Sequence, residues 1–312
     1  MNAVAALIQV VVCALGGLLL TGVLAKVRAR AEGRRGAPVT QPLREVVKWW
    51  SRESPRSSQA SVVSRVVPNA LLATALVSSA LVPLVRIPSS STYSLDLVSV
   101  AMLWIAGAVL LTLLALDAGT AFGGMGASRV LTLAALAEPA LVVALAGLSV
   151  SASSSSLGVI LSSELAHPAR LLSPSHVLIA LSLVVVLITE TGRMPVDNPS
   201  THLELTMIHE ALVLETGGQD YAVVALAEAS RLGFLFSVVV TLLAPWGIAR
   251  GGGIIPLVGG VVALGLKLAL AAGMIGALEV TSAKIRLFRV PELLAGGVVS
   301  AGLGVLVAVV SR

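Results

Sequence analysis

The chain alternates long apolar runs with short polar stretches, and the apolar runs have the length of membrane-spanning helices. An α-helix needs roughly 20 mainly apolar residues to cross the hydrocarbon core of a bilayer. Eight runs approach or exceed that length, and the fifth is the shortest: 3–25, 66–85, 97–116, 131–150, 174–189, 222–248, 254–280 and 293–311. The pattern predicts an all-α integral membrane protein with eight transmembrane helices, in which residues 1–312 form a single polytopic membrane domain.

The positions of lysine and arginine predict the orientation, because cytoplasmic loops retain positive residues. The 26–65 loop holds ten of them. If this loop is cytoplasmic, alternation of the helices places five more on that side: Arg129, Arg193, Lys284, Arg286 and Arg289. Four fall on the other side: Arg86, Arg170, Arg250 and Arg312. This imbalance predicts that both termini lie on the outer face. The first run should remain as a helix, because no positive residue precedes it and a basic stretch follows it.

Composition agrees with a membrane protein and excludes several other classes. Hydrophobic residues make up 56% of the chain and charged residues 12%, whereas a soluble domain has roughly 25% charged residues. The net charge is +5, but aromatic residues are only 3%, too few for nucleic-acid stacking platforms. Cys13 is the single cysteine. The chain therefore has no thiolate set for an iron–sulfur cluster or a structural zinc site, and no internal disulfide.

Ionisable residues inside the predicted helices are the main functional candidates, because a charge at the bilayer centre costs about 2.5–3.5 kcal/mol. Four lie deep in their helices: Glu138, Glu228, Arg231 and Lys267. Three lie at the predicted cytoplasmic ends: Asp117, Glu190 and Glu279. Together the acids would form a polar funnel that opens to the cytoplasm and ends at Lys267, an arrangement typical of a proton relay. Taken singly, a local Glu228–Arg231 ion pair and a packed structural lysine remain simpler interpretations.

The 190–221 segment, between the fifth and sixth predicted helices, has signals of a further helix. Asn198 and Pro199 suit an N-cap and first helical position, and Gly217 and Gly218 suit a stop. Between them, acids and histidines fall on different faces of the helix. We therefore expect an amphipathic helix that lies at the membrane interface or docks a partner.

Two enzymatic motifs are incomplete. His209-Glu210 could begin an HExxH zinc motif, but Val213 occupies the position of the second histidine. His202 and His209 are seven residues apart, about 10 Å along a helix, too far to bind one metal. The Gly123–Gly126 stretch lacks the lysine of a phosphate-binding loop. We expect it to be a flexible loop.

Several motifs together resemble those of one membrane-subunit family. They are Glu190-Thr-Gly-Arg-Met-Pro-Val-Asp197, Thr201-His-Leu-Glu-Leu-Thr-Met-Ile-His-Glu210, Leu214-Glu215, Gly33-Arg-Arg-Gly36 with Gln41-Pro42 and Lys48, Gly123-Gly-Met-Gly-Ala-Ser-Arg129 with Glu138-Pro139, and Arg286-Leu-Phe-Arg-Val-Pro-Glu292. The family is shared by formate hydrogenlyase, hydrogenase-4 and other energy-converting nickel–iron hydrogenases, and by the complex I subunit at the junction of the membrane and peripheral arms. The resemblance extends across the chain.

The resemblance implies a membrane-anchoring and proton-translocating, energy-coupling subunit of a nickel–iron hydrogenase complex in a bacterial cell (inner) membrane. This chain would bind no cofactor, and the iron–sulfur clusters and the nickel–iron centre would lie in hydrogenase-like small and large subunits. Antiporter-like membrane subunits and a formate dehydrogenase are the other implied partners.

The resemblance also implies roles for individual residues. The acids of the 190–215 loop would line a chamber and the proton route: Glu190, Asp197, Glu204, Glu210 and Glu215. Arg193 would order this loop by pairing with them. Partner docking would use Arg34, Arg35, Arg44, Lys48, His202 and His209.

The alternative within this family is a complex I type quinone reductase, with a quinone chamber under the same loop. Ser200 and His202 stand where the quinone-reducing relatives have glutamate, which favours the hydrogenase branch. Val130 replaces an acid common in the relatives and weakens any role of that loop in proton entry. A stand-alone transporter is a third class, but the internal repeat that it would show is not evident.

Overall fold

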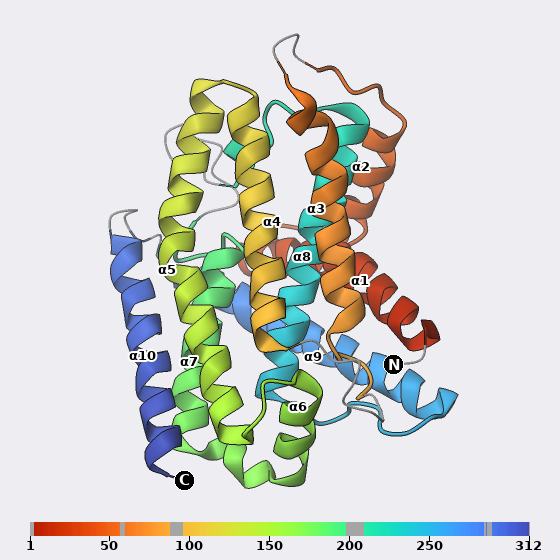
Figure 1. Ribbon diagram of the computed structural model, residues 1–312. Helices are drawn as coiled ribbons and strands as arrows, with labels where there is room; N and C mark the ends of the chain where they lie inside the picture. The colour runs from red at the N-terminus through yellow and green to blue at the C-terminus, as the bar shows by residue number, and fades with distance from the viewer. Residues whose placement is uncertain are drawn as a thin grey trace.

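The computed structural model describes residues 3–56, 60–87, 96–197, 209–283, 285 and 289–311. In this part of the chain, helices account for nearly all regular structure, apart from two isolated β-bridges (Figure 1). The helices are α1 (Ala3–Ala31), α2 (Gln41–Trp50), α3 (Val62–Leu81), α4 (Leu97–Asp117), α5 (Ala121–Ala152), α6 (Leu157–Ala166), α7 (Pro174–Glu190), α8 (Gly218–Leu243), α9 (Ile254–Thr281) and α10 (Val290–Val310), with short 3-10 helices η2 (Pro168–Leu172) and η3 (Glu210–Leu212).

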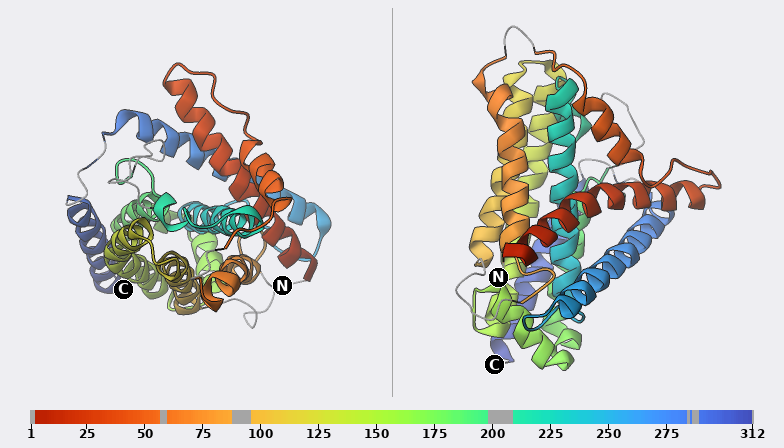
Figure 2. Two further views of the ribbon diagram at one scale, coloured as in Figure 1. Left: turned by 90° about the horizontal axis from the view of Figure 1, so that it is seen from above. Right: turned by 90° about the vertical axis from the view of Figure 1, so that its right-hand side faces the viewer.

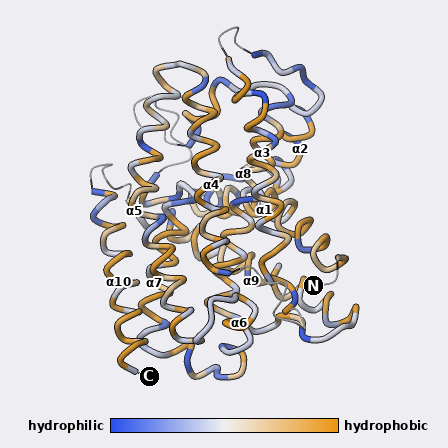
Figure 3. The backbone as a smooth tube through the Cα atoms, in the orientation of Figure 1, coloured by the Kyte–Doolittle hydropathy of each residue, from blue (hydrophilic) through white to orange (hydrophobic). Residues whose placement is uncertain are grey.

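Each of the eight predicted apolar runs overlaps one of these helices, although α3 and α8 end before their predicted runs do. Seven helices of the described part are long and apolar enough to cross a membrane: α1, α3, α4, α5, α8, α9 and α10. The eighth, α7, is apolar but has only 17 residues. The chain is therefore a multi-pass membrane protein. Figure 3 shows hydrophilic residues concentrated at the end of the molecule that carries α2.

Most of the long helices stand roughly side by side, and α1 and α9 are inclined to them (Figures 1 and 2). The upright helices are α3, α4, α5, α7, α8 and α10. On one flank, α1 and α9 cross the bundle at a steep tilt and contact each other (Figure 2, right). Near their C-terminal ends, a Cβ atom at Gly276 would lie 2.6 Å from Val27 Cγ1, so glycine permits this close approach. Helix α8 contacts both the flank helices and α3 of the bundle.

Helices α1 and α8 meet backbone to backbone through two glycines. A Cβ atom on Gly17 would lie 1.8 Å from the carbonyl oxygen of Ala229, and one on Gly233 would lie 2.3 Å from that of Cys13. Small residues at such crossings let membrane helices approach closely and gain dispersion energy, since lipid gives no hydrophobic drive for association. No larger residue fits at either position without moving a helix.

Gln9, in the first helix, ties α1 to the loop that follows α3. Its side-chain amide donates to the carbonyls of Ser79 and Val82, and its oxygen accepts from the amides of Leu84 (3.0 Å) and Val85 (3.1 Å). The residue is fully buried. These bonds satisfy backbone groups released where α3 ends, which matters in a lipid environment because water cannot replace them.

The Gly123–Gly126 stretch is helical, so the prediction of a flexible loop was wrong. It forms the first turn of α5, which begins ten residues before the predicted run. Thr120 is the N-cap, and its hydroxyl accepts from the amide of Gly123 at 3.2 Å. A Cβ atom at Gly123 would lie 2.5 Å from the carbonyl of Ala115, so glycine at this position reflects the tight α4–α5 turn.

The amphipathic helix predicted in the 190–221 segment is not an α-helix where the structure describes it. Residues 198–208 lie outside the described residues. Residues 209–217 contain only the short η3 and turns, and Gly217 and Gly218 begin α8 instead of ending a preceding helix. The helices α2 and α6 are additional elements that the apolar runs did not predict.

Candidate functional site

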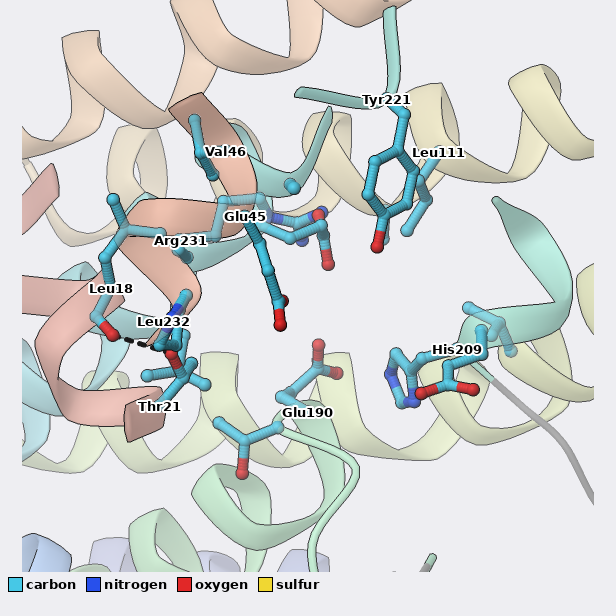
Figure 4. Close-up of a pocket in the computed structure, with 18 of the residues that line it drawn as sticks. Leu18, Thr21, Glu45, Val46, Leu111, Glu190, His209, Tyr221, Arg231 and Leu232 are labelled. Atoms are coloured by element: carbon cyan, nitrogen blue, oxygen red, sulfur yellow. Dashed lines mark hydrogen bonds and ion pairs between the residues drawn. The ribbon is translucent and has the colours of Figure 1, made fainter. Parts of the chain in front are cut away.

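A cavity of about 380 Å³ opens between α1, α2, α4, α8 and the segment that follows α7. Its polar lining includes four acids, one guanidinium, one imidazole and one phenol: Glu45, Glu190, Glu210, Glu228, Arg231, His209 and Tyr221. In Figure 4, Glu45 reaches into the cavity from α2 and Glu190 faces it from the end of α7. Residues far apart in the chain therefore share one polar chamber.

Arg231 is the buried cation of this chamber. Its Nη1 lies 3.2 Å from Glu228 Oε1, one helical turn earlier, and its Nη2 donates to the backbone oxygen of Trp104 at 3.4 Å. The guanidinium carbon lies 4.6 Å from the centre of the Trp104 ring. A Cβ atom at Gly107 would lie 2.8 Å from that carbon, so the glycine provides the space for the guanidinium. Arg231 is thus held by an acid, a carbonyl and an aromatic face.

Trp104 connects Arg231 to Glu190. Its indole Nε1 donates to Glu190 Oε2 at 3.1 Å while its ring lies against the guanidinium. The Phe234 ring is stacked with the Trp104 ring, with their centres 6.5 Å apart. Glu138 in α5 lies within electrostatic range of Arg231 and Glu190. The structure therefore brings together three of the predicted acids, Glu138, Glu190 and Glu228, around the predicted Arg231.

A second ion pair lies beside this chamber. Arg193 Nη1 is 3.3 Å from Glu279 Oε1, and both side chains are buried. Among the described residues, Arg193 Nε and Glu279 Oε2 are buried without a hydrogen-bond partner, which makes them positions for ordered water. Arg193 lines a neighbouring cavity of about 620 Å³, and Glu45 lines both cavities. Asp197, also buried, lies in the same turn as Arg193.

His209 closes the chamber on the side of the 191–197 turn. Its ring lies against Gly192, where an added Cβ atom would be 2.7 Å from Nδ1, and glycine also suits the positive φ of +58° at that position. Nδ1 is buried and has no hydrogen-bond partner within the part of the chain that the structure describes. Burial lowers the pKa of His209 below its ordinary value. The neutral imidazole is therefore the form that fits the folded loop.

This burial predicts a pH-dependent opening of the 209–217 segment. The folded pKa of His209 is lowered, so the neutral ring stabilises the closed segment above the unfolded pKa, and that stability is lost as the pH falls below about 6.5. Hydrogen exchange of the backbone amides in 209–217, corrected for intrinsic rates, should show opening that increases by up to about tenfold per pH unit in this range. His209→Gln should remove the pH dependence, and an unchanged dependence in that variant would contradict the assignment.

Other predicted residues lie apart from the chamber. Asp117 accepts from the backbone amides of Ser61 (3.0 Å) and Ser64 (3.1 Å) and from both hydroxyls, so it holds the start of α3. Lys267 Nζ lies 4.9 Å from the centre of the Trp246 ring, on the side of the α8–α9 loop. These two residues do not line the chamber.

The remaining loop residues have separate positions. Glu210 lines the chamber mouth, and Glu215 is exposed and lines another cavity, beside the Arg56–Asp220 ion pair of 2.8 Å. Glu204 and His202 lie outside the described residues. The basic residues near α2 are exposed at the surface: Arg34, Arg35, Arg44 and Lys48.

The sequence reasoning missed Glu45, Trp104, Gly107 and Tyr221. One signal was present, because Trp104 is one of only four tryptophans and stands in an apolar run. Its role depends on the approach of α4 to α7 and α8, which the sequence alone does not give. The chamber's donors are carboxylates, an imidazole and a guanidinium, which suit proton transfer, whereas iron–sulfur clusters require thiolates. Cys13, the only thiol, is buried in α1 away from the chamber lining.

Comparison with known proteins gives concordant matches. The family model described as NADH dehydrogenase matches residues 4–310. Hydrogenase-4 component C of Escherichia coli is 30% identical over 246 residues, 78% of this chain and 76% of that protein. Formate hydrogenlyase subunit 4 of Escherichia coli is 26% identical over 291 residues, 92% of each chain. A chain in the structure of the membrane-bound sulfane sulfur reductase, an archaeal respiratory membrane complex, superposes with a TM-score of 0.78 at 18% identity over 98% of both chains and shows the same fold.

Proposed function

The chain belongs to the NADH dehydrogenase family of complex I subunit 1 type, and we propose that it is the membrane-anchoring and energy-coupling subunit of a nickel–iron hydrogenase complex in a bacterial cell membrane. The two curated relatives are components of hydrogenase-4 and formate hydrogenlyase. The observation that carries the proposal of proton coupling is the group of Glu190 and Glu228 around the buried Arg231 in one chamber. Acids that line a chamber beside a fixed cation are suited to accept and release protons within a membrane.

In this proposal the chain forms one membrane domain of eight spans, with both termini on the outer face. Helix α7 counts as the eighth span: its 17 residues cover about 25 Å at 1.5 Å per residue, close to the hydrocarbon thickness. The side that carries α2 and the chamber is then cytoplasmic, as the positive-inside rule requires for the loops around Arg34 and Arg44.

Cytoplasmic partners would dock on that side. The exposed basic residues Arg34, Arg35, Arg44 and Lys48 lie on or beside α2, whose Glu45 lines the chamber. Binding at α2 would therefore act directly on the chamber wall. We propose hydrogenase-like small and large subunits as these partners, with the metal centres in them, and antiporter-like subunits alongside in the membrane. A formate dehydrogenase would complete a formate hydrogenlyase-like assembly.

Purification in a mild detergent, followed by mass spectrometry of the copurified subunits, tests this proposal. Nickel–iron hydrogenase subunits are the expected partners. An NADH dehydrogenase module, together with reduction of a quinone analogue by the complex, would instead establish the quinone-reductase alternative. A chain purified without any partner under the same conditions would contradict both.

The coupling role has its own prediction at Glu190. In Glu190→Gln the amide oxygen can still accept from Trp104, so the complex should assemble, but the side chain no longer titrates. Proton translocation into vesicles, recorded with a pH-sensitive dye during hydrogen turnover, should fall at least about tenfold, because an ionisable group of the relay is lost. Glu292→Gln, which changes an exposed carboxyl at the start of α10, is the matched control and should pump normally. Normal pumping by Glu190→Gln would contradict the assignment.

A further inference from the structure

On the side of the molecule away from α2, an apolar groove lies between the N-terminal ends of α1 and α9. It has a volume of about 470 Å³. Its walls are aliphatic side chains from both helices: Val4, Ala5, Ile8, Ile254, Leu257, Val258, Val261 and Val262. The helices contact each other closely at Gly276 and Val27, near their other ends, and they separate toward this end (Figure 2, right). The groove is therefore open at the surface of the molecule, where its apolar residues Val4, Val258 and Val262 are exposed.

One cation stands at the end of this groove. Arg86 lines it and is only 9% exposed. The backbone on both sides of Arg86 is fixed to the α8–α9 loop, because Ala249 N donates to Val85 O at 2.9 Å and Ile87 N donates to Ala249 O at 3.1 Å. The guanidinium also donates to the carbonyl of Gly251. A guanidinium has five N–H donors, more than one carbonyl can accept.

The start of α9 adds a second positive contribution at the same place. Gly253 is its N-cap and gives no side-chain capping bond, and Gly252, Gly253 and Ile254 line the groove. The free amides and the helix dipole favour an anion at a helix N-terminus. A Cβ atom on Gly252 would lie 3.4 Å from Arg86 Nη2, so the guanidinium and the helix start are neighbours.

We propose that this groove binds one acidic phospholipid, with its phosphate at Arg86 and an acyl chain between α1 and α9. The groove has a cation at one end, beside the α8–α9 loop, and aliphatic walls along the rest of its length. This order matches a lipid, which has its anion at the membrane interface and its acyl chains in the interior. A helix of a partner protein fits less well than a lipid. It would have to provide an acid at one end, and only a few residues of each helix form the groove that would hold it. A zwitterionic headgroup would bring a second cation next to Arg86, so the site favours a net negative lipid.

The proposal does not depend on the coupling role or on which side of the membrane is cytoplasmic. It requires only that the 244–253 loop lies at a membrane surface, as expected where α8 ends and α9 begins. In the orientation proposed above, the lipid belongs to the outer leaflet. Its effect would be to hold the tilted α1 and α9 at a fixed separation.

Native mass spectrometry of the purified full chain, titrated with dioleoyl phosphatidylglycerol or dioleoyl phosphatidylcholine, tests the site. The unaltered chain should retain one phosphatidylglycerol more tightly than phosphatidylcholine. Arg86→Gln can still donate to Gly251 but loses the charge, and it should retain phosphatidylglycerol about fivefold less well. Arg250→Gln, in the same loop and exposed, is the matched control and should bind as the unaltered chain does.

A second variant fills the groove without changing charge. Val258 is 56% exposed on the groove wall, so Val258→Trp can fold and should also weaken retention. Millimolar inorganic phosphate should fail to displace the lipid. The proposal is overturned if both variants retain phosphatidylglycerol normally, if phosphatidylcholine is retained equally well, or if inorganic phosphate displaces the lipid while Val258→Trp has no effect.

Discussion

Replacing Arg231 by methionine should destabilise the chain by about 1–3 kcal/mol, because the acids of the chamber lose the hydrogen bond and the charge of a buried guanidinium. Glu228 loses its 3.2 Å partner, and Glu190 and Glu138 lose a nearby positive charge. The Trp104 ring also loses the guanidinium that lies 4.6 Å from its centre. Methionine has a similar length, so the effect reports the charge and its hydrogen bonds more than the volume.

Cys13 provides the assay for this effect. It is the only cysteine and is 1% exposed, so a fluorogenic maleimide reacts with it only when the chain unfolds. Thermal unfolding of the purified chain should shift strongly downward in Arg231→Met and partly recover in Arg231→Met with Glu228→Gln. The control is Arg56→Met, which breaks the more exposed Arg56–Asp220 pair and should cost less than about 1 kcal/mol. Equal stability of the Arg231 and Arg56 variants would contradict the central role of Arg231.

Gly17→Val should prevent α1 from packing on α8. The new Cβ atom would lie 1.8 Å from the Ala229 carbonyl oxygen, a backbone atom that cannot rotate away. The helices would have to separate, and the close contact that drives their association would be lost. We expect almost no folded protein in a detergent extract, measured as the monodisperse fraction in size-exclusion chromatography.

The preceding residue gives a matched control. Gly16 lies on the same helix, but a Cβ atom there would meet nothing within 4 Å. Gly16→Val makes the same chemical change and should yield folded protein at the level of the unaltered chain. If Gly17→Val and Gly16→Val give the same yield, the α1–α8 crossing does not have the geometry described.

The long apolar helices could be predicted from sequence, because a bilayer requires continuous apolar length and little else. The Glu228–Arg231 pair followed in the same way from helical spacing, since three residues separate them on one helix. By contrast, α2 was missed because it is short and amphipathic: it carries charges beside Leu43, Val46 and Val47, so no continuous apolar run marks it. Such a helix is recognised by its amphipathic periodicity and stabilised by its contacts with α1 and α8, and hydropathy alone does not reveal it.

The contents of the chamber were harder to predict, since depth in a helix says nothing about which neighbour a side chain faces. Lys267 is buried at the middle of α9, as its position suggested, yet it lies over Trp246 and not beside the acids. Asp117 is at the predicted helix end but holds the start of α3. Trp104 carries no charge that would mark it in the sequence, although it contacts both Arg231 and Glu190.

The four hydrogen bonds of Gln9 constrain how the protein can be made. Synthesis proceeds from the N-terminus, so α1 enters the membrane about seventy residues before Ser79, Val82, Leu84 and Val85 are available as partners. Until then the amide is a buried polar group, which costs several kcal/mol in hydrocarbon. The first helix should therefore remain near the interface or the insertion machinery until α3 arrives. Packing of α1 against α3 would then be an early step in the folding of this subunit, and it would require the hydrogen bonds of Gln9.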